Sequence, residues 1–270
     1  MQNQFSILIN TSDGFSDCWN PFFLLFKKYW GECKYPLFLN TEKKSYSFEG
    51  LHIKSTCVSI ENENLTWSQC FIKALNQIDT DIVLYFQEDY FIKDKVDLAF
   101  IENQAQRMLE DPLIKRIGLT TNDYKGKLFK SEFNELWEAS NNVEYKICTQ
   151  ASLWRKETLI SYLQPQENGW MFEILGTLRS RRRKYERFLT LNREIYNLEN
   201  QPISYIHTGI IKGQWHPEIP KVFYENEIFN VNFKVRGFYN INKPSFQRRF
   251  ELFKRFMRSP QFIIKSYFDI

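Results

Sequence analysis

Residues 83–94 read VLYFQEDYFIKD, and the abrupt change of character inside this stretch decides the predicted fold. The apolar run 82–86 has the length and composition of a strand that is buried on both faces of a sheet. It stops at Gln87, and two adjacent acids, Glu88 and Asp89, follow it. A buried strand that ends in acids is typical of a parallel α/β sheet with a ligand site at its carboxyl edge.

Strand and helix patterns alternate on both sides of this strand. Further strands are predicted at 5–11, 35–39, 51–59 and 116–120, and helices from Asn20-Pro21, from the capping-box pattern Thr66-Trp67-Ser68-Gln69, and over 95–110. Such alternation requires crossover connections, so consecutive strands run parallel and helices pack on the sheet faces. The predicted fold class is α/β, with a Rossmann-like, mostly parallel sheet flanked by helices.

The second half of the chain has less regular patterns. Residues 123–147 show no clear period. Helices are predicted over 155–163 and from about 168, and a strand followed by a loop over 203–216. A last helix, predicted over 245–258, has basic residues on one side and an apolar face formed by Phe246, Phe250, Phe253 and Met257. We predict one domain over residues 1–240 and a basic amphipathic tail over 241–270.

The composition excludes several classes of protein. Hydrophobic residues make up 43% of the 270 residues and aromatic residues 17%, which is enough for a sizeable core. The net charge is +4, and five bases against one acid within 248–258 account for all of it. The rest of the chain is neutral and carries no recognition motif, so nucleic acid is not an expected partner.

The cysteines and the absence of targeting patterns indicate a compartment. The five cysteines are an odd number without C-x-x-C spacing, so neither a zinc site nor a disulfide framework fits, and we predict reduced core thiols. The first residues lack the pattern of a signal peptide, and no run of about 18 apolar residues could span a membrane. These features predict a cytoplasmic protein.

The acids after the strand have more than one possible use. Glu88 and Asp89 are expected at the carboxyl edge of the sheet, beside Thr11, Ser12 and Asp13, which follow the first strand. Acids there can hold a divalent cation that carries a phosphate-containing substrate, or accept hydrogen bonds from substrate hydroxyls. They can also cap the next turn or form a solvated strand end, and the residues alone leave these alternatives open.

Three stretches carry a resemblance to a known family. They are SDGFSDCWNPFFLLFKKYW (12–30), TWSQCFIKAL (66–75) and VLYFQEDYF (83–91), with TQASLWRKE and NGWMFEILGT as weaker matches. Together they resemble bacterial GT-A glycosyltransferases that build capsular polysaccharide or the outer sugars of lipopolysaccharide. The resemblance covers roughly residues 5–125. It implies a GT-A-like fold and transfer of a sugar from a nucleotide donor, expected to be a UDP-sugar, to a cell-surface glycan.

The resemblance also implies a donor site. The loop Thr11, Ser12 and Asp13 would contact the nucleoside, and Gln87, Glu88 and Asp89 would lie at the sugar diphosphate. The family often has Asp-x-Asp here, and Gln87 replaces its first acid. One expectation is therefore Mn²⁺ or Mg²⁺ held by Asp89 and His207. The other is a metal-independent site in which Lys212, or Arg181, Arg182, Arg183 and Lys184, neutralises the departing diphosphate.

Catalytic and acceptor residues are predicted in the second half. Inverting transfer needs a base for the acceptor hydroxyl, and Glu173, a single acid among apolar neighbours, is the candidate, with Glu167 as the fallback. Trp154 and Trp170 are expected to contact the acceptor. The alternatives are a solvent-facing Glu173, a core Trp154 and, for the run RSRRRK, a solvated helix face or a contact with an acidic membrane. Of the other histidines, His52 is expected to be structural and His216 is a weaker ligand candidate.

The basic tail suggests where the protein works. Its predicted helix would lie in the interface of an anionic membrane, where a lipid-linked acceptor would be found, or would dock its Phe face onto the domain. The first alternative places the protein peripherally on the inner face of the cell membrane. Two rival functions use the same acids: a carboxylate-dependent hydrolase, and a glycan- or nucleotide-binding protein without catalysis.

Overall fold

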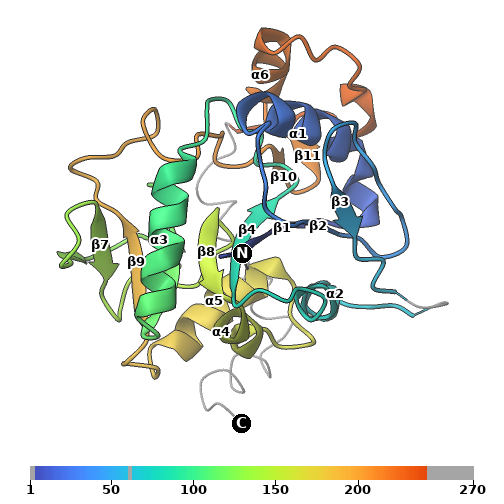
Figure 1. The fold of residues 1–270 in the computed structure, drawn as a ribbon. Coiled ribbons are helices and arrows are strands. Elements are labelled where there is room, and N and C mark those ends of the chain that lie inside the picture. Colours follow the sequence, from blue (N-terminus) through green and yellow to red (C-terminus); the bar gives the residue numbers. More distant parts are fainter. Residues whose placement is uncertain (1–3, 60–62, 242–270) are drawn as a thin grey trace.

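A computed structural model describes residues 4–59 and 63–241 of the chain (Figure 1). The strands are β1 (Ser6–Asn10), β2 (Leu37–Asn40), β3 (Ile53–Ser55), β4 (Ile82–Gln87), β5 (Ile114–Gly118), β6 (Leu128–Lys130), β7 (Leu136–Ala139), β8 (Ser152–Arg155), β9 (Arg187–Leu191), β10 (Ile210–Ile211) and β11 (Gln214–Trp215). The helices are α1 (Ser16–Tyr29), α2 (Trp67–Leu75), α3 (Leu98–Glu110), α4 (Lys156–Tyr162), α5 (Gly169–Ser180) and α6 (Ile219–Glu225), with short 3-10 turns η1 (Asp13–Phe15) and η2 (Phe233–Val235).

The first nine strands form one sheet in the order β3-β2-β1-β4-β8-β5-β9-β7-β6. All of them run in one direction except β8 and β7, which pair antiparallel with both of their neighbours. Strands β10 and β11 form a separate antiparallel hairpin. The predicted α/β class, a mostly parallel sheet flanked by helices, is confirmed.

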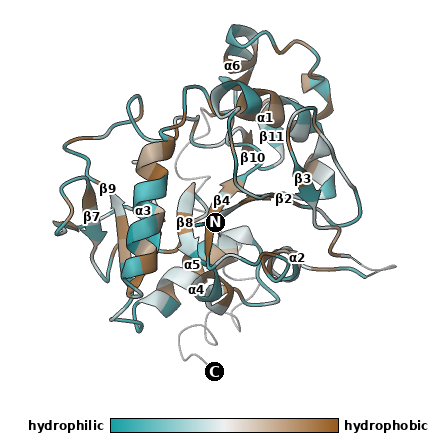
Figure 2. Cartoon of the chain, viewed as in Figure 1, coloured by the Kyte–Doolittle hydropathy of each residue, from teal (hydrophilic) through white to brown (hydrophobic). Residues whose placement is uncertain are grey.

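Strand β4 lies in the middle of the core because its side chains alternate between two faces, each covered by helices (Figure 2). On one face Phe86 packs edge-on against Phe22 of α1, with 6.4 Å between ring centroids. On the other, Tyr85 packs against Phe71 of α2 at 5.4 Å. Helix α3 adds to the first face, and α4 and α5 add to the second. The sheet is therefore the middle of three layers, with helices on both faces, and β4 is buried within it.

The observed helix starts can be compared with those predicted from local sequence patterns. The capping box of α2 is confirmed, because Gln69 N donates to Thr66 Oγ1 at 3.2 Å and Thr66 N donates to Gln69 Oε1 at 2.9 Å. The predicted start at Asn20 is wrong, since α1 begins at Ser16. Helices α3, α4 and α5 lie within one to three residues of their predicted starts.

Several predictions for the second half are wrong. The apparently irregular stretch 123–147 contains β6 and β7, and β8 had not been predicted at all. The strand expected from 203 is absent: Tyr205 is buried because it stacks on Tyr90 at 4.7 Å, and it forms only an isolated bridge with Ile92. The predicted tail helix over 245–258 lies outside the described residues.

Among the described residues, no helix is both long enough and apolar enough to cross a membrane.

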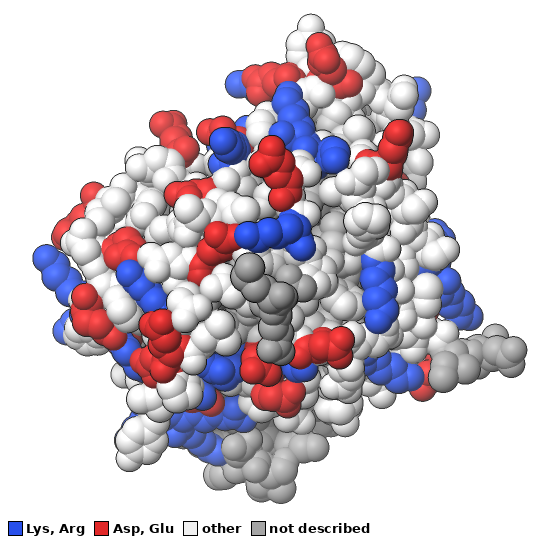
Figure 3. All heavy atoms as spheres, viewed as in Figure 1, with Lys and Arg blue, Asp and Glu red and all other residues white. Residues whose placement is uncertain are grey.

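All five cysteines are unpaired, but only Cys18, Cys70 and Cys148 are buried, and Cys57 is exposed, so the prediction of five core thiols is wrong. On the face shown in Figure 3, acidic and basic side chains are interspersed.

Candidate active site

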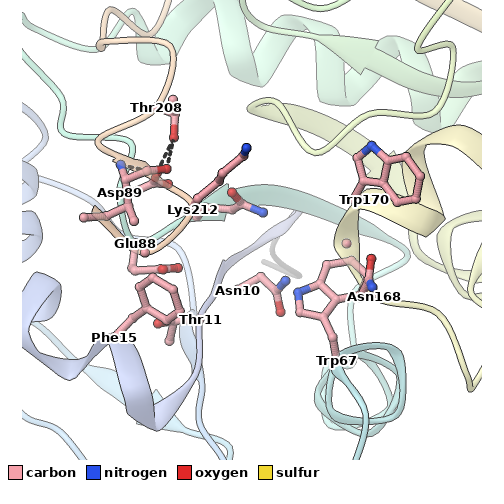
Figure 4. Close-up of a pocket in the computed structure, with 14 residues that line it drawn as sticks. Asn10, Thr11, Phe15, Trp67, Glu88, Asp89, Asn168, Trp170, Thr208 and Lys212 are labelled. Atoms are coloured by element: carbon pink, nitrogen blue, oxygen red, sulfur yellow. Dashed lines mark hydrogen bonds between the residues drawn. The ribbon is translucent and has the colours of Figure 1, made fainter. Parts of the chain in front are cut away.

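A cavity of about 520 Å³ lies at the carboxyl ends of β1 and β4, which pair in parallel with Asn10 beside Gln87 (Figure 4). Five segments contribute to it: the loops after β1 and β4, the first turns of α2 and α5, and the β10–β11 hairpin. Its lining residues are Asn10, Thr11, Phe15, Trp67, Gln87, Glu88, Asp89, Asn168, Gly169, Trp170, Thr208, Ile210, Lys212 and Gly213. The predicted acids therefore meet a cavity at the predicted edge of the sheet.

Glu88 is buried at the end of β4, with only 8% of its surface exposed. Burial raises the pKa of its carboxyl group well above the usual range, and the neighbouring charge of Asp89 raises it further. A hydrogen bond with the Thr11 side chain and the positive charge of Arg236 oppose this shift. A solvated strand end, one of the alternatives from the sequence, does not describe this residue.

Asp89 holds a segment that is distant in sequence, residues 208–210, and we call these contacts the Asp89 clamp. Its Oδ2 accepts hydrogen bonds from Thr208 Oγ1 at 2.6 Å, Gly209 N at 3.1 Å and Ile210 N at 2.9 Å (Figure 4). The contact is tight, since a Cβ atom on Gly209 would lie 2.4 Å from the ring of Phe91 and 2.7 Å from the Asp89 carbonyl oxygen. The other carboxylate oxygen, Oδ1, is buried and has no hydrogen-bond partner among the described residues.

This clamp places the hairpin turn of Lys212 and Gly213 against the cavity. Both residues have positive φ, 51° and 81°, as a two-residue type I′ turn requires. Figure 4 shows the Lys212 side chain reaching into the space between Asp89 and Trp170. The turn is also held from behind: Arg236 donates to the carbonyl oxygen of Gly213 at 3.4 Å.

Arg236 joins the hairpin to the loop after β1. Its guanidinium group pairs with both carboxylate oxygens of Asp17, at 2.5 and 2.7 Å, and donates to the carbonyl oxygen of Gly14 at 2.8 Å. It also stacks over the ring of Phe15 at 4.5 Å. Two walls of the cavity that are far apart in sequence are thereby tied together by one side chain.

Asp13 lies on the far side of the same loop. Its carboxylate oxygens accept hydrogen bonds from the backbone N–H groups of Glu42, Lys43 and Lys44, at 2.9 to 3.1 Å. It lines a second cavity of about 550 Å³, together with Gly14, Glu42, Lys43, Ser59, Glu63, Asn64 and Leu65. Of the three loop residues predicted to bind the donor, Thr11 therefore faces the first cavity and Asp13 the second, while Ser12 lines neither.

Glu173 lies one turn of α5 beyond Trp170, on the same helix face. Its Oε1 accepts hydrogen bonds from both N and Oγ1 of Thr149, each at 2.8 Å. Burial raises the pKa of its carboxyl group, and the bonds from Thr149 oppose that shift. Although Glu173 is not a lining residue, it is close enough to Tyr85 that its charge, after burial and Glu88, helps to raise the pKa of the tyrosine hydroxyl.

Some candidates are not placed where the sequence suggested. Trp154 is only 1% exposed, lying edge-on to Phe188 at 5.9 Å in the core, so the structure does not support its expected contact with an acceptor. Glu167 is buried, is bound through both oxygens to Arg179 at 2.6 and 2.7 Å, and does not line the cavity, so the structure does not support it as the fallback base. His207 does not line the cavity.

The basic run 181–184 follows the carboxyl end of α5, whereas the cavity meets its amino end. A helix of 12 residues is about 18 Å long, so these bases lie far from the two acids. Arg183 instead donates to the Ser161 hydroxyl at 2.6 Å. Of the predicted cations for a diphosphate, only Lys212 lines the cavity.

The residues present can contribute to a metal site but do not complete one. Within residues 4–59 and 63–241, no group of three or more His, Cys, Asp and Glu side chains could hold a metal ion. The unpartnered Oδ1 of Asp89 and the adjacent Glu88 would fit a Mg²⁺ or Mn²⁺ ion that brings phosphate oxygens of its own, because Mg²⁺ is usually bound by one or two carboxylates plus substrate phosphates.

Sequence reasoning missed several lining residues. Asn10 was predicted only as part of a strand, yet it accepts a hydrogen bond from Asn40 Nδ2 at 2.7 Å and donates to the Tyr85 hydroxyl at 3.3 Å. Trp67 had been assigned to the apolar helix face, although its place directly after the cap Thr66 was a usable signal. Phe15, Asn168, Thr208, Ile210 and the two glycines also line the cavity.

No protein-family model and no curated protein matches the chain. Among solved structures, one crystal structure of S. aureus TarS aligns with 86% of this chain and 41% of its own, at 15% identity and a TM-score of 0.47. A crystal structure of TarS 1–349 in complex with UDP-GlcNAc aligns with 86% of this chain and 69% of its own, at 14% identity and a TM-score of 0.48. The chain thus spans well under two thirds of the first TarS chain.

Proposed function

We propose that this protein is a glycosyltransferase that moves a sugar from a nucleotide-sugar donor, a UDP-sugar, to a cell-surface glycan. The observation that carries the proposal is the cavity at the carboxyl edge of β1 and β4. There, two buried acids and Lys212 lie across from two tryptophans (Figure 4). A nucleoside diphosphate sugar needs both a polar, charged end and an apolar one, and this cavity offers them together.

The diphosphate would lie at the charged end. Lys212 would neutralise the phosphate oxygens, either alone or together with Mn²⁺ or Mg²⁺ held between the phosphates and Asp89 Oδ1. Glu88, which lines the cavity beside Asp89, would be a second oxygen ligand for such an ion or would accept hydrogen bonds from substrate hydroxyls. The nucleoside would extend past Thr11 and Phe15 toward the second cavity beside Asp13.

Glu173 would be the general base. Its raised pKa brings the carboxylate closer to the range in which it can accept a proton near neutral pH. The carboxylate would take the proton of an acceptor hydroxyl while that oxygen attacks the anomeric carbon. The bond from this carbon to the diphosphate breaks, and the nucleoside diphosphate leaves with the electron pair. Trp170, on the same face of α5, would position the acceptor.

The acceptor is proposed to be a capsular, O-antigen or lipopolysaccharide glycan, reached in the cytoplasm at the inner face of the cell membrane. This part of the proposal rests on the family resemblance and on the basic, phenylalanine-rich sequence after residue 241, which lies outside the described residues. A lipid-linked glycan is the acceptor form that such a tail would suit.

A thermal-shift screen of nucleotides and nucleotide sugars, with Mn²⁺ and with EDTA, tests the proposal. UDP and at least one UDP-sugar should raise the melting temperature, because a ligand that binds only the folded state stabilises it. Equal stabilisation in EDTA supports the metal-independent form. Lys212→Gln should reduce the shift, whereas Lys221→Gln, at an exposed position of α6, should not. If no nucleotide stabilises the protein in either buffer, the proposal fails.

The same screen separates the rivals. A hydrolase would cleave glycosides with no nucleotide present, and purified protein can be assayed directly with chromogenic glycosides. A binding protein would retain every measurable behaviour in the variant Glu173→Gln, since it transfers no proton.

A further inference from the structure

We infer that the wall formed by Trp67, Asn168, Gly169 and Trp170 is a subsite for a pyranose ring of the acceptor. The inference rests on the proposed function, in which Trp67 has no role and the form of the acceptor sugar is open. An acyclic polyol would not fit this class of site.

The wall is a single unit built from two helix starts. Trp67 lies in the first turn of α2, and Trp170 in the first turn of α5. The two turns are joined by hydrogen bonds from Ser68 N to the Glu167 carbonyl oxygen, at 3.3 Å, and from the Thr66 hydroxyl to the Pro165 carbonyl oxygen. These two hydrogen bonds hold the start of α2 against the segment that leads into α5, so both indoles line the same side of the cavity (Figure 4).

The Trp67 ring is fixed from behind and open toward the cavity. A Cβ atom on Gly169 would lie 3.4 Å from both Cε2 and Cζ2 of the indole, so the ring rests against the Gly169 backbone. The rings of Phe71 and Phe172 pack against it at 5.3 and 5.7 Å. Trp67 nevertheless remains half-buried and lines the cavity. A ring held in this way loses little conformational freedom when a ligand binds.

The chemistry of the wall matches a sugar ring. An indole presents a flat, apolar face whose π electrons attract the slightly positive C–H groups of a pyranose. Polar groups at the rim would meet the hydroxyls: Asn168 Oδ1 accepts from Met171 N at 3.0 Å, which leaves its NH₂ group as a donor. Pockets of this kind combine aromatic walls with a few placed polar groups. An acyclic polyol has no comparable rigid C–H face.

The position of the wall assigns it to the acceptor rather than to the donor. Figure 4 shows Trp67, Asn168 and Trp170 on the side of the cavity opposite Glu88 and Asp89. Glu173 follows Trp170 by one helical turn on the same face. A ring seated on this wall would therefore have its hydroxyls near the proposed base, with the donor sugar between it and the acids.

The test measures binding of methyl hexopyranosides and of acyclic polyols such as ribitol and sorbitol in the presence of UDP, by saturation-transfer NMR. At least one pyranoside should bind, with polyols at least several-fold weaker. Trp67→Leu and Trp170→Leu should each weaken pyranoside binding by about 2- to 12-fold. Trp67→Phe, which keeps an aromatic face, should recover part of the affinity. Unchanged circular dichroism and melting temperature establish that each variant is folded.

Three results would overturn the inference: polyols that bind as well as pyranosides, no pyranoside binding at all, or leucine variants with unchanged affinity. A fourth is a loss of affinity for the UDP-sugar but not for UDP in Trp67→Leu, which would assign the wall to the donor sugar. UDP affinity itself is measured in every variant. If UDP binds and the pyranosides do not, only this inference fails; if UDP does not bind to the wild type either, the proposed function fails.

Discussion

Replacing Glu173 with glutamine is expected to abolish sugar transfer while leaving donor binding intact. The change is conservative in structure. Both hydrogen bonds that Thr149 makes to this side chain end on a single oxygen, Oε1, and glutamine retains an oxygen that can accept them. The variant therefore removes the charge and the proton acceptor without removing the contacts that hold the side chain.

The expected magnitudes follow from that difference. A general base contributes roughly 10²- to 10⁴-fold to a rate, so transfer should fall by about that factor. Whereas the transfer rate falls, the free energy of unfolding should rise in the variant at high pH. Because burial raises the pKa of Glu173 in the folded state, its stabilising contribution is present below the unfolded pKa and is lost as the pH rises through the folded pKa. Glu173→Gln should thus gain stability over the wild type at pH 8 and lose that gain near pH 4.

Two assays check this. Transfer is measured as UDP release in the presence of acceptor, and the unfolding midpoint in urea is measured at pH 4 and pH 8. UDP affinity should change by less than about twofold. A variant with wild-type transfer, or one whose stability relative to the wild type falls between pH 4 and pH 8, would refute the assignment of Glu173 as a half-buried general base.

Three further changes test the supports of the site. Asp89→Ala should lower the free energy of unfolding in urea by about 3 kcal/mol or more, because three donors of segment 208–210 lose their acceptor. Asp89→Asn should cost less, because its amide oxygen can still accept hydrogen bonds. Equal losses in the two variants would show that Asp89 does not hold segment 208–210 through these bonds. Gly209→Ala should lower the free energy of unfolding by about 1–3 kcal/mol, because the added Cβ atom clashes with Phe91. Gly14→Ala is the control: its Cβ atom would lie no closer than 3.7 Å to another atom, so the cost should be under about 0.5 kcal/mol. Similar costs would show that Gly209 is not tightly packed. Glu167→Gln should cost about 3–5 kcal/mol because it leaves Arg179 charged and buried; a loss below about 1 kcal/mol would show that the pair is not buried as described.

The central part of the fold could be predicted because its signals are local. The run 82–86 alternates its side chains between two faces, and the capping box at Thr66 marks the start of α2 within four residues of sequence. Parallel connection rules then place Glu88 and Asp89 at one edge of the sheet with Thr11. No knowledge of distant pairing was needed for any of these steps.

What escaped prediction depends on long-range contacts. Strand β8 runs antiparallel between β4 and β5, so its short sequence next to α4 reads like the approach to a helix. The partners that fix Asp89 lie about 120 residues further along the chain, and no local pattern connects them. Helical periodicity places Trp67 on an apolar face without distinguishing a core from a cavity. For Trp154 the sequence left a core position and an acceptor contact as alternatives, and the structure shows the core position.

Titration calorimetry of UDP into the wild type, Lys212→Gln and Lys221→Gln tests whether this cavity binds the nucleotide of the donor. We expect one UDP bound per chain and an affinity that falls about tenfold or more in Lys212→Gln, but not in the control Lys221→Gln, because a charge-assisted hydrogen bond at the cavity is lost. The absence of UDP binding, or equal affinity in all three proteins, would contradict the assignment of this cavity as a nucleotide-sugar site.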